Sequence, residues 1–270
     1  MKLAYAISAS PTRFAAVAQG RLGASIRYLA GLGYQGVELA IRDPAQVNLA
    51  EIVEVTRQAG VVVPAIGTGQ AYLEEGLCLT APDPAMRERA VARLEAHLPG
   101  AGRLAAFLIV GLIHGPVPSD VGRERATEWL LDGLGRVAHR AAEHGVRIVI
   151  EPINRYESNW LNTVDEVMDL ISRLGAENVG VLPDTFHMNM EEQDLAASLE
   201  RARSRLWHVH VADSNRRAPG AGHLEFGRIA SHLRALEYRG AVSAEILPLP
   251  SFEAAAAQTI AVMRPLLDPA

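Results

Sequence analysis

Four strand-like segments in the second half of the chain end at residues that can bind a cation or move a proton. Glu151 closes the apolar run VRIVI, Asp184 closes VGVLP, His210 lies in LWHVHVA, and Glu245 ends AVSAE. A carboxylate at the end of a buried strand is costly unless a partner neutralises it. Three carboxylates close together would repel each other, and their pKa values would rise, unless a cation were bound between them. The sequence therefore predicts a divalent metal site formed by these four residues.

The chemistry of the four predicted ligands indicates which ion they would hold. Carboxylate oxygens with one imidazole suit Mn²⁺, Mg²⁺ or Co²⁺ better than an ion that prefers thiolates. The single cysteine, Cys78, lies outside the pattern. We expect one bound divalent ion, with Mn²⁺ first and Mg²⁺ or Co²⁺ as alternatives.

Two further histidines lie near the predicted ligands. His208 and His210 are two residues apart on one strand, so both side chains face the same side. His210 is nearer to the carboxyl end of the strand and is the better ligand, while His208 is expected to support it or to lie in the core. His187 follows Asp184 in DTFHMN, where a substrate hydroxyl could reach its ring.

Charged residues on the loops after the ligand-bearing strands are candidates for substrate contacts. Arg155 and Glu157 follow Glu151, and Arg216 follows His210 in the chain. Glu38, near the end of an earlier strand, is expected to act as a hydrogen-bond acceptor.

The elements that must position these residues form a regular alternation. Strands are expected at Lys2–Ser8, Gly36–Ala40, Val61–Gly67, Ala105–Ile113, Val146–Glu151, Val179–Asp184, Leu206–Ala212 and Ala241–Ile246. Helices are expected at Leu22–Leu32, Leu49–Gln58, Pro84–Leu98, Arg123–His144, between the capping residue Thr163 and Gly175, and at Glu191–Arg203, Arg228–Leu236 and Phe252–Met263.

Eight strand–helix repeats predict an α/β fold, a closed (β/α)8 TIM barrel that forms a single domain over residues 1–270. The spacings between the four predicted ligands are 33, 26 and 35 residues, close to the ~31 residues per repeat of a barrel of about 250 residues. Consecutive strands would therefore bring all four side chains to one rim. A doubly wound sheet would need a phosphate-binding fingerprint after its first strand, and the sequence has none there.

Composition limits the compartment and the partners. The net charge is −5, and no basic run is present, which argues against nucleic acid and against an anionic membrane surface. A single cysteine cannot form an internal disulfide, so we expect a cytoplasmic protein. The N-terminal residues are expected to form a strand and not a signal peptide, and no apolar segment is long enough to span a membrane.

Several of these segments resemble the sugar phosphate isomerase/epimerase family with its xylose isomerase-like TIM barrel, and within it the D-tagatose 3-epimerase and L-ribulose 3-epimerase group. The matching stretches are EPINRYE, LPDTFHMNMEE, HVHVADSNRRAPGAGH and AEIL. The resemblance to the 5-keto-L-gluconate epimerases is closer and extends through GYQGVELAIRDP, AIGTGQAYL and LPLP.

The resemblance implies a carbohydrate epimerase of the isomerase class and assigns roles to single residues. Glu151, Asp184, His210 and Glu245 would bind the metal, and Glu151 and Glu245 would also act as the acid/base pair. Glu157, His187 and Arg216 would hold the substrate. Relatives are often dimers or tetramers, so a homo-oligomer is expected.

The chemistry implied is inversion of the carbon next to a keto group through a cis-enediolate. One glutamate would remove the proton from one face, and the other would return a proton to the opposite face. A single base on one face would only restore the starting configuration.

The substrate is the least determined part of the prediction. The expected reaction interconverts 5-keto-L-gluconate and D-tagaturonate, and a cation should then meet the substrate carboxylate; Arg155, Arg217, His114 and Arg13 are the candidates. Alternatives are a 3-epimerase of neutral ketoses such as D-tagatose or L-ribulose and a hydroxypyruvate isomerase-like aldose–ketose isomerase. A metal phosphodiesterase resembling apurinic endonucleases is a more distant alternative.

Overall fold

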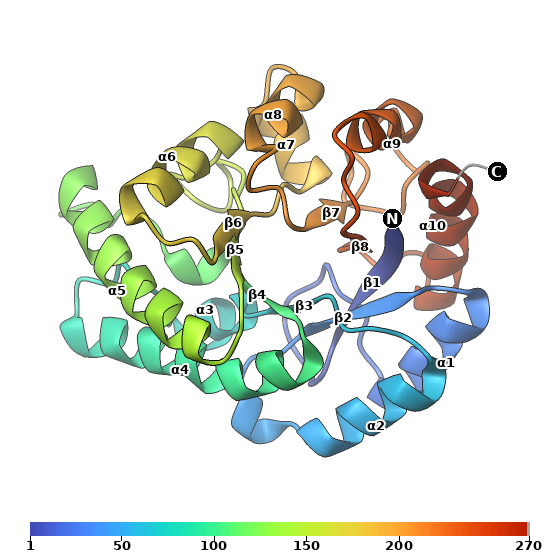
Figure 1. The fold of residues 1–270 in the computed structure, drawn as a ribbon, viewed down its shortest axis with the longest axis horizontal. Helices are drawn as coiled ribbons and strands as arrows, with labels where there is room; N and C mark the ends of the chain where they lie inside the picture. The colour runs from blue at the N-terminus through green and yellow to red at the C-terminus, as the bar shows by residue number, and fades with distance from the viewer. Residues whose placement is uncertain (269–270) are drawn as a thin grey trace.

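Eight parallel strands form one sheet at the centre of the molecule (Figure 1). The computed structural model describes residues 1–268, so the expected domain end at residue 270 lies outside the described residues. The strands are β1 (Lys2–Ser8), β2 (Gly36–Ala40), β3 (Ala65–Gly67), β4 (Phe107–Val110), β5 (Ile148–Ile150), β6 (Val179–Val181), β7 (Val209–Val211) and β8 (Ala241–Ala244).

The sheet closes into a barrel. Its strand order is β6-β5-β4-β3-β2-β1-β8-β7, and the two outermost strands are joined by isolated parallel bridges that pair Val181 with Leu206 and Asp184 with His210. The predicted (β/α)8 TIM barrel is thus confirmed. The second of these bridges also holds two of the predicted metal ligands side by side.

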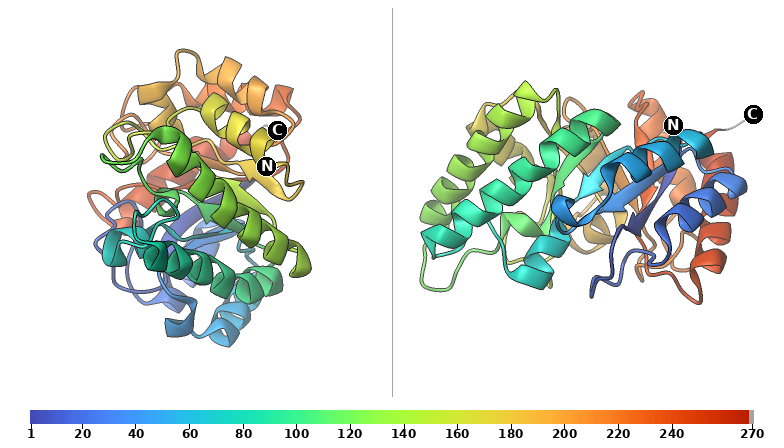
Figure 2. Two further views of the ribbon diagram at one scale, coloured as in Figure 1. Left: turned by 90° about the vertical axis from the view of Figure 1, so that its left-hand side faces the viewer. Right: turned by 90° about the horizontal axis from the view of Figure 1, so that it is seen from below.

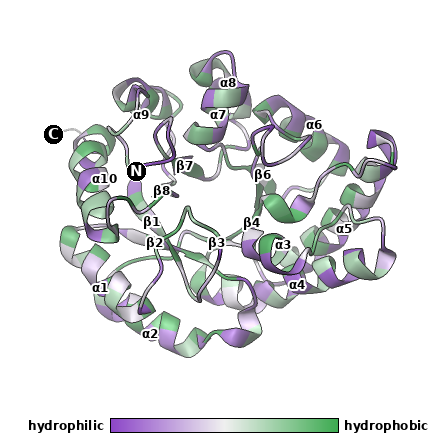
Figure 3. Ribbon diagram, turned by 180° about the vertical axis from the view of Figure 1, so that it is seen from behind, coloured by the Kyte–Doolittle hydropathy of each residue, from purple (hydrophilic) through white to green (hydrophobic). Residues whose placement is uncertain are grey.

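Helices surround the sheet, as the two perpendicular views show (Figure 2). The α-helices are α1 (Leu22–Leu32), α2 (Leu49–Ala59), α3 (Gly69–Glu75), α4 (Pro84–Leu104), α5 (Arg123–Glu143), α6 (Val164–Leu174), α7 (Thr185–Glu191), α8 (Leu195–Ala202), α9 (Phe226–Ala235) and α10 (Phe252–Leu267), with short 3-10 helices η1 (Pro44–Gln46) and η2 (Leu112–His114). Hydrophobic and hydrophilic residues alternate along the helices that surround the barrel (Figure 3). None of the helices in residues 1–268 is both long and apolar enough to cross a membrane.

Helix α6 shows how local sequence sets these boundaries. The Thr163 side chain accepts a hydrogen bond from the Glu166 amide, and the Glu166 side chain returns to the Thr163 amide, which completes the predicted capping box. Gly175 ends the helix in the left-handed conformation that glycine adopts without strain. Val164, Val167 and further apolar residues are buried against the barrel.

The structure differs from the expected elements in several places. The strands from β3 to β8 are shorter than expected: β3, for example, begins at Ala65 and not at Val61, and β4 ends at Val110 and not at Ile113. The predicted helix Glu191–Arg203 corresponds to α8, which begins only at Leu195, while α7 before it and α3 after β3 are helices that the sequence did not predict. Helix α4 continues through Pro99 to Leu104. The short helices α3 and α7 lie at the rim of the barrel, after β3 and β6. They bring Gln70 and His187 to the site.

Apolar side chains fill part of the barrel interior. Ala65, Ile109, Val149 and Leu182 form a separate buried cluster against which Phe107 and Trp207 pack. Such layers make the interior of a TIM barrel a packed core and not a channel. Polar chemistry is therefore confined to the carboxyl-terminal part of the barrel.

Candidate functional site

The four predicted metal ligands converge at the carboxyl ends of β5 to β8. Each of Glu151, Asp184, His210 and Glu245 offers a ligand atom, and all four atoms lie within 4.8 Å of one another. Glu151 and Glu245 directly follow β5 and β8, while His210 lies within β7. Asp184 caps α7, because its Oδ1 accepts the Phe186 amide at 2.8 Å. The cap holds this carboxylate in place and leaves its second oxygen free to face the cluster.

Three of these ligand atoms are buried and have no hydrogen-bond partner: Oε1 of Glu151, Oδ2 of Asp184 and Nδ1 of His210. Burying such atoms unpaired is unfavourable. Nδ1 of His210 lies 3.3 Å from Oε1 of Glu151. The unpaired atoms face one another in a cluster of the size and chemistry of a metal site, so these residues fit a divalent ion that prefers oxygen and imidazole ligands.

The electrostatics of the cluster agree with this fit. Burial, together with the charge of Glu151, raises the pKa of Glu245 to about 8. Burial likewise raises the pKa of Asp184 to about 6, and Glu151 adds to that shift. The protein environment therefore disfavours two of the negative charges, as expected for carboxylates placed to share a cation.

A second group of charged residues lies next to the first and shares His210. The Glu38 carboxylate on β2 lies 2.7 Å from Nε2 of His208 and 2.9 Å from Nε2 of His210. Burial alone would raise the pKa of Glu38, but His210 and His208 bring that pKa well below its usual range. Glu38 is the hydrogen-bond acceptor that the sequence predicted, and His208, the residue just before β7, contacts it beside His210.

His187 on α7 is held in one tautomer. The Asn154 side-chain amide donates to Nδ1 of His187 at 2.7 Å, and Oδ1 of Asn154 accepts the Tyr156 amide, which fixes the orientation of the Asn154 side chain. Burial and the nearby Arg216 lower the pKa of His187 well below its usual value, so the ring is neutral. Nε2 of His187 then carries the proton and lies 3.9 Å from oxygens of Glu151 and Asp184.

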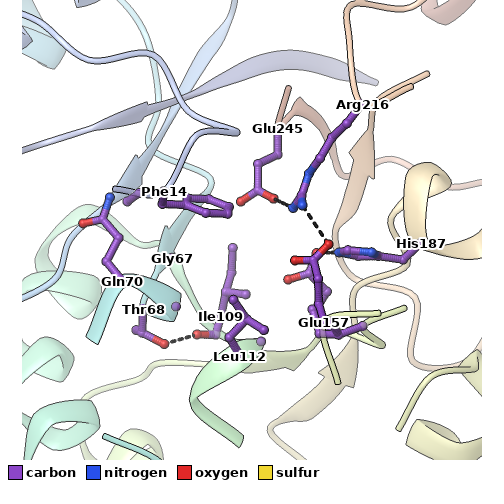
Figure 4. Close-up of a pocket in the computed structure, with 15 residues that line it drawn as sticks. Phe14, Gly67, Thr68, Gln70, Ile109, Leu112, Glu157, His187, Arg216 and Glu245 are labelled. Atoms are coloured by element: carbon purple, nitrogen blue, oxygen red, sulfur yellow. Dashed lines mark hydrogen bonds and ion pairs between the residues drawn. The ribbon is translucent and has the colours of Figure 1, made fainter. Parts of the chain in front are cut away.

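Arg216 bridges two carboxylates above the cluster (Figure 4). Its guanidinium lies 2.9 Å from Oε1 of Glu157 and 3.3 Å from Oε2 of Glu245, and its central carbon lies 5.5 Å from the ring centre of Phe14 and 4.9 Å from that of Phe186. Its backbone has a positive φ of 58°, uncommon for a residue with a side chain. Burial lowers the pKa of Arg216, but the surrounding carboxylates more than compensate and the net shift is upward.

A pocket opens beside these residues. It is lined by Glu151, Glu157, His187, Arg216 and Glu245 together with Phe14, Ala40, Gly67, Thr68, Gly69, Gln70, Ile109, Gly111, Leu112 and Ile153. Charged groups after β5 to β8 form one side, and residues within or after β1 to β4, most of them small or apolar, form much of the other side (Figure 4). Such a pocket can bind a small polar molecule with an apolar edge.

The four residues predicted as candidates to contact a substrate carboxylate lie outside the pocket lining. Arg155 is paired with Glu191, and Arg13 is paired with Glu74. His114 is buried with its Nδ1 2.7 Å from the Gly115 carbonyl oxygen, while Arg217 is exposed. None of these four side chains, all in the described part of the chain, lines the pocket.

Several residues of the site were missed by sequence reasoning. Asn154 belongs to the same loop as Glu157 and donates to it at 2.8 Å, so its place three residues after Glu151 could have indicated it. Phe14 and Gln70 follow β1 and β3 and could have been found by reading every strand end. Nothing in the sequence indicated that Leu112 would reach the pocket from η2.

Comparisons with known proteins agree with the fold. Residues 26–266 match the family described as xylose isomerase-like TIM barrel. D-psicose 3-epimerase of Agrobacterium fabrum is 32% identical over 83% of this chain and 79% of its own length. L-ribulose 3-epimerase of a Methylomonas species is 28% identical over 87% of this chain and 81% of its own length.

Among solved structures, the apo form of 3-keto-D-glucoside 4-epimerase from E. coli superposes with a TM-score of 0.84. It is 23% identical to this chain and covers 98% of this chain and 99% of its own length. That similarity concerns the fold.

Proposed function

Because the chain belongs to the xylose isomerase-like TIM barrel family, we propose that it inverts the carbon next to the keto group of a ketose with the help of a divalent metal. The enzyme is a carbohydrate epimerase of the isomerase class. The observation that carries the reaction is the pair of glutamates at the ends of β5 and β8, two strands that are separated by β6 and β7 around the barrel and whose glutamates both line the pocket.

Glu151, Asp184, His210 and Glu245 are the proposed metal ligands, supported by the convergence of their ligand atoms and by the unpaired buried atoms of the first three. A bound divalent cation would offset the negative charge of the cluster and make the carbon next to the substrate carbonyl more acidic. Mn²⁺ is the proposed ion, and Mg²⁺ or Co²⁺ are the alternatives for this site of three carboxylates and one imidazole.

The remaining steps are proton transfers by the two glutamates. Glu151 or Glu245 removes the proton from the carbon, which leaves a cis-enediolate, and the other glutamate returns a proton to the opposite face. The raised pKa of Glu245, about 8, favours a group that can carry a proton near neutral pH. Two proton carriers on different sides of the substrate are what distinguishes epimerisation from an aldose–ketose shift.

Three other residues would hold the substrate. His187 presents its Nε2–H to the cluster and can donate to a substrate oxygen. Arg216 and Glu157, which contact each other at 2.9 Å, offer a donor and an acceptor to neighbouring hydroxyls. These contacts would orient the reacting carbon between the two glutamates.

Two substrate classes are candidates. The lining of the pocket supports a neutral ketose such as D-psicose, D-tagatose or L-ribulose, because Arg216 is the single Arg or Lys among the described lining residues and it is already paired with Glu157 and Glu245. The resemblance of the sequence supports 5-keto-L-gluconate as the alternative. In that case Arg155, Arg217 or His114 would have to approach the pocket.

The test is a substrate panel with Mn²⁺ in D2O, followed by NMR. We expect the inverted carbon next to the keto group to gain deuterium from solvent. A higher kcat/KM on neutral ketoses supports the first class, and a higher kcat/KM on 5-keto-L-gluconate or D-tagaturonate supports the second. Deuterium at C1 or C2 of an aldose–ketose pair, without epimer formation, would overturn the proposed reaction.

Two expectations about the cellular state belong to the same proposal. The enzyme would act in the cytoplasm, consistent with its free and buried Cys78. It would form a homo-oligomer, a dimer or a tetramer, which light scattering coupled to gel filtration can measure.

A further inference from the structure

Glu38 lies deep in the barrel beside the proposed metal cluster. Its side chain comes from β2, and only 2% of the residue is exposed. Oε1 accepts from Nε2 of His210 at 2.9 Å, and Oε2 lies 2.7 Å from Nε2 of His208 and 3.1 Å from Nε2 of His210. One carboxylate therefore contacts two imidazoles, His210 on β7 and His208 just before it, although β1 and β8 lie between β2 and β7 in the sheet.

The contact between Glu38 and His210 decides which nitrogen of His210 can bind a metal. An ionised carboxylate only accepts hydrogen bonds, so Nε2 of His210 must carry a proton to bond with Glu38. The lone pair of a neutral His210 ring is then on Nδ1, the atom that lies 3.3 Å from Glu151 and has no hydrogen-bond partner. The same bond fixes the plane of the ring, because Nε2 is held by an acceptor from another strand.

We propose that Glu38 is a positioning residue that fixes the orientation and tautomer of His210, with Nδ1 facing the cluster of Glu151, Asp184 and Glu245. His208 completes the arrangement by holding the second oxygen of Glu38. The inference rests on the proposed metal site and extends it to a residue that does not itself bind the ion. Carboxylate partners of metal-binding histidines typically contribute about 10- to 100-fold in metal affinity.

An alternative is that Glu38, His208 and His210 hold an ion themselves, since their atoms also lie within 4.8 Å of one another. Both oxygens of Glu38 are already hydrogen-bonded to ring nitrogens. A cation there would have to displace both bonds. The unpaired oxygens of Glu151 and Asp184 lie in the other cluster, so the geometry favours Glu38 as a support.

The test is the affinity of the metal-stripped enzyme for Mn²⁺, measured from the electron paramagnetic resonance signal of free Mn²⁺. Glu38→Gln keeps the shape of the side chain and removes its charge, and we expect the Kd for Mn²⁺ to rise by about 10- to 100-fold. Val37→Ala is the matched control. Val37 is on the same strand, fully buried in the core between the sheet and the helices, so its truncation should lower Tm and leave the Kd unchanged.

The outcomes separate this inference from the proposed function. If the wild-type enzyme binds Mn²⁺ and Glu38→Gln binds it within about twofold of wild type, Glu38 has no positioning role. If the wild-type enzyme shows no saturable Mn²⁺ binding, the proposed metal site itself fails.

A second measurement does not depend on the folding of Glu38→Gln. Histidine-selective ¹⁵N NMR of the wild-type enzyme, with Zn²⁺ as a diamagnetic probe and His208→Gln to assign the signals, should show that His210 keeps its proton on Nε2 while its Nδ1 signal shifts on metal addition. A proton on Nδ1 of His210 in the metal-bound state would overturn the inference.

Discussion

Two groups of buried charges share His210, and their hydrogen bonds set them apart. In the upper cluster of Glu151, Asp184 and Glu245, one buried oxygen of Glu151 and one of Asp184 lack partners, and the pKa values of Asp184 and Glu245 are raised. In the lower trio of Glu38, His208 and His210, both oxygens of Glu38 are paired and its pKa is lowered. Burial is similar in both groups. The difference is in the hydrogen-bond donors. The Glu38 oxygens are paired with histidine nitrogens, so Glu38 can support His210, whereas the unpaired oxygens of Glu151 and Asp184 can bind a cation.

The largest effect should come from the upper cluster. Glu245→Gln removes a proposed proton carrier and one ligand charge, and we expect kcat to fall by at least about 1,000-fold, since general acid–base catalysis alone contributes 100- to 10,000-fold, roughly. NMR of epimer formation measures the loss, while isothermal titration detects substrate that still binds. An enzyme that kept a tenth of its turnover would show that Glu245 is not a proton carrier.

The raised pKa values also predict how metal binding depends on pH. Asp184 and Glu245 have folded-state pKa values of about 6 and about 8, above their unfolded values of roughly 4. Their protonated forms therefore contribute stability that is complete below about pH 4 and is lost as pH rises through 6 to 8.

The metal-free enzyme should accordingly lose Tm between pH 5.5 and pH 8, and the increase in Tm on adding Mn²⁺ should grow over the same range. At a free concentration of 100 times Kd, Mn²⁺ would stabilise the fold by about 2.7 kcal/mol. Differential scanning calorimetry with Mn²⁺ or with EDTA provides the measurement. A Tm increase that stayed constant with pH would mean that these carboxylates do not titrate in the site.

His187 is held by a neighbouring side chain in the same way as His210. Asn154 fixes the tautomer of His187, as Glu38 is proposed to fix that of His210. Asn154→Ala removes the bond to Nδ1, and we expect kcat/KM to fall about tenfold, the worth of about 1.4 kcal/mol. Asn154→Asp places an acceptor where Asn154 has a donor, so we expect a larger fall in kcat/KM than for Asn154→Ala. Equal kcat/KM in wild type and both variants would show that the bond from Asn154 to His187 does not contribute to catalysis.

The smallest effect is expected for His208. His208→Gln retains an N–H group that can reach Glu38, so the Kd for Mn²⁺ should rise by only about threefold, less than for loss of the carboxylate. The Mn²⁺ titration used for Glu38→Gln measures it. If the Kd for Mn²⁺ rose more in His208→Gln than in Glu38→Gln, His208 would approach the metal directly.

The sequence predicted the fold and the grouping of the four proposed ligands because a barrel converts position along a strand into position at the rim. Glu151, Asp184, His210 and Glu245 could thus be placed together without any knowledge of their contacts. The capping box at Thr163 and Glu166 was predictable for a similar reason, since its partners are three residues apart.

The other features of the site depend on the paths of the loops and on contacts between distant strands, which local sequence patterns do not determine. Arg155 was a candidate for the substrate, but the loop after β5 pairs it with Glu191 on α7. The helix α7 was missed because Asp184 was interpreted only as a ligand, while it also caps that helix. The contact between Glu38 and His210 spans 172 residues, and only the closed barrel brings the two together.

In the proposed arrangement, the upper cluster holds the ion and the lower trio supports it. Anomalous diffraction from a crystal of the enzyme grown with Mn²⁺ tests this most directly. We expect one manganese peak per chain among Glu151, Asp184, Glu245 and Nδ1 of His210, with Nε2 of His210 still bonded to Glu38. A peak between Glu38 and His208, or the absence of a peak from the upper cluster, would contradict it.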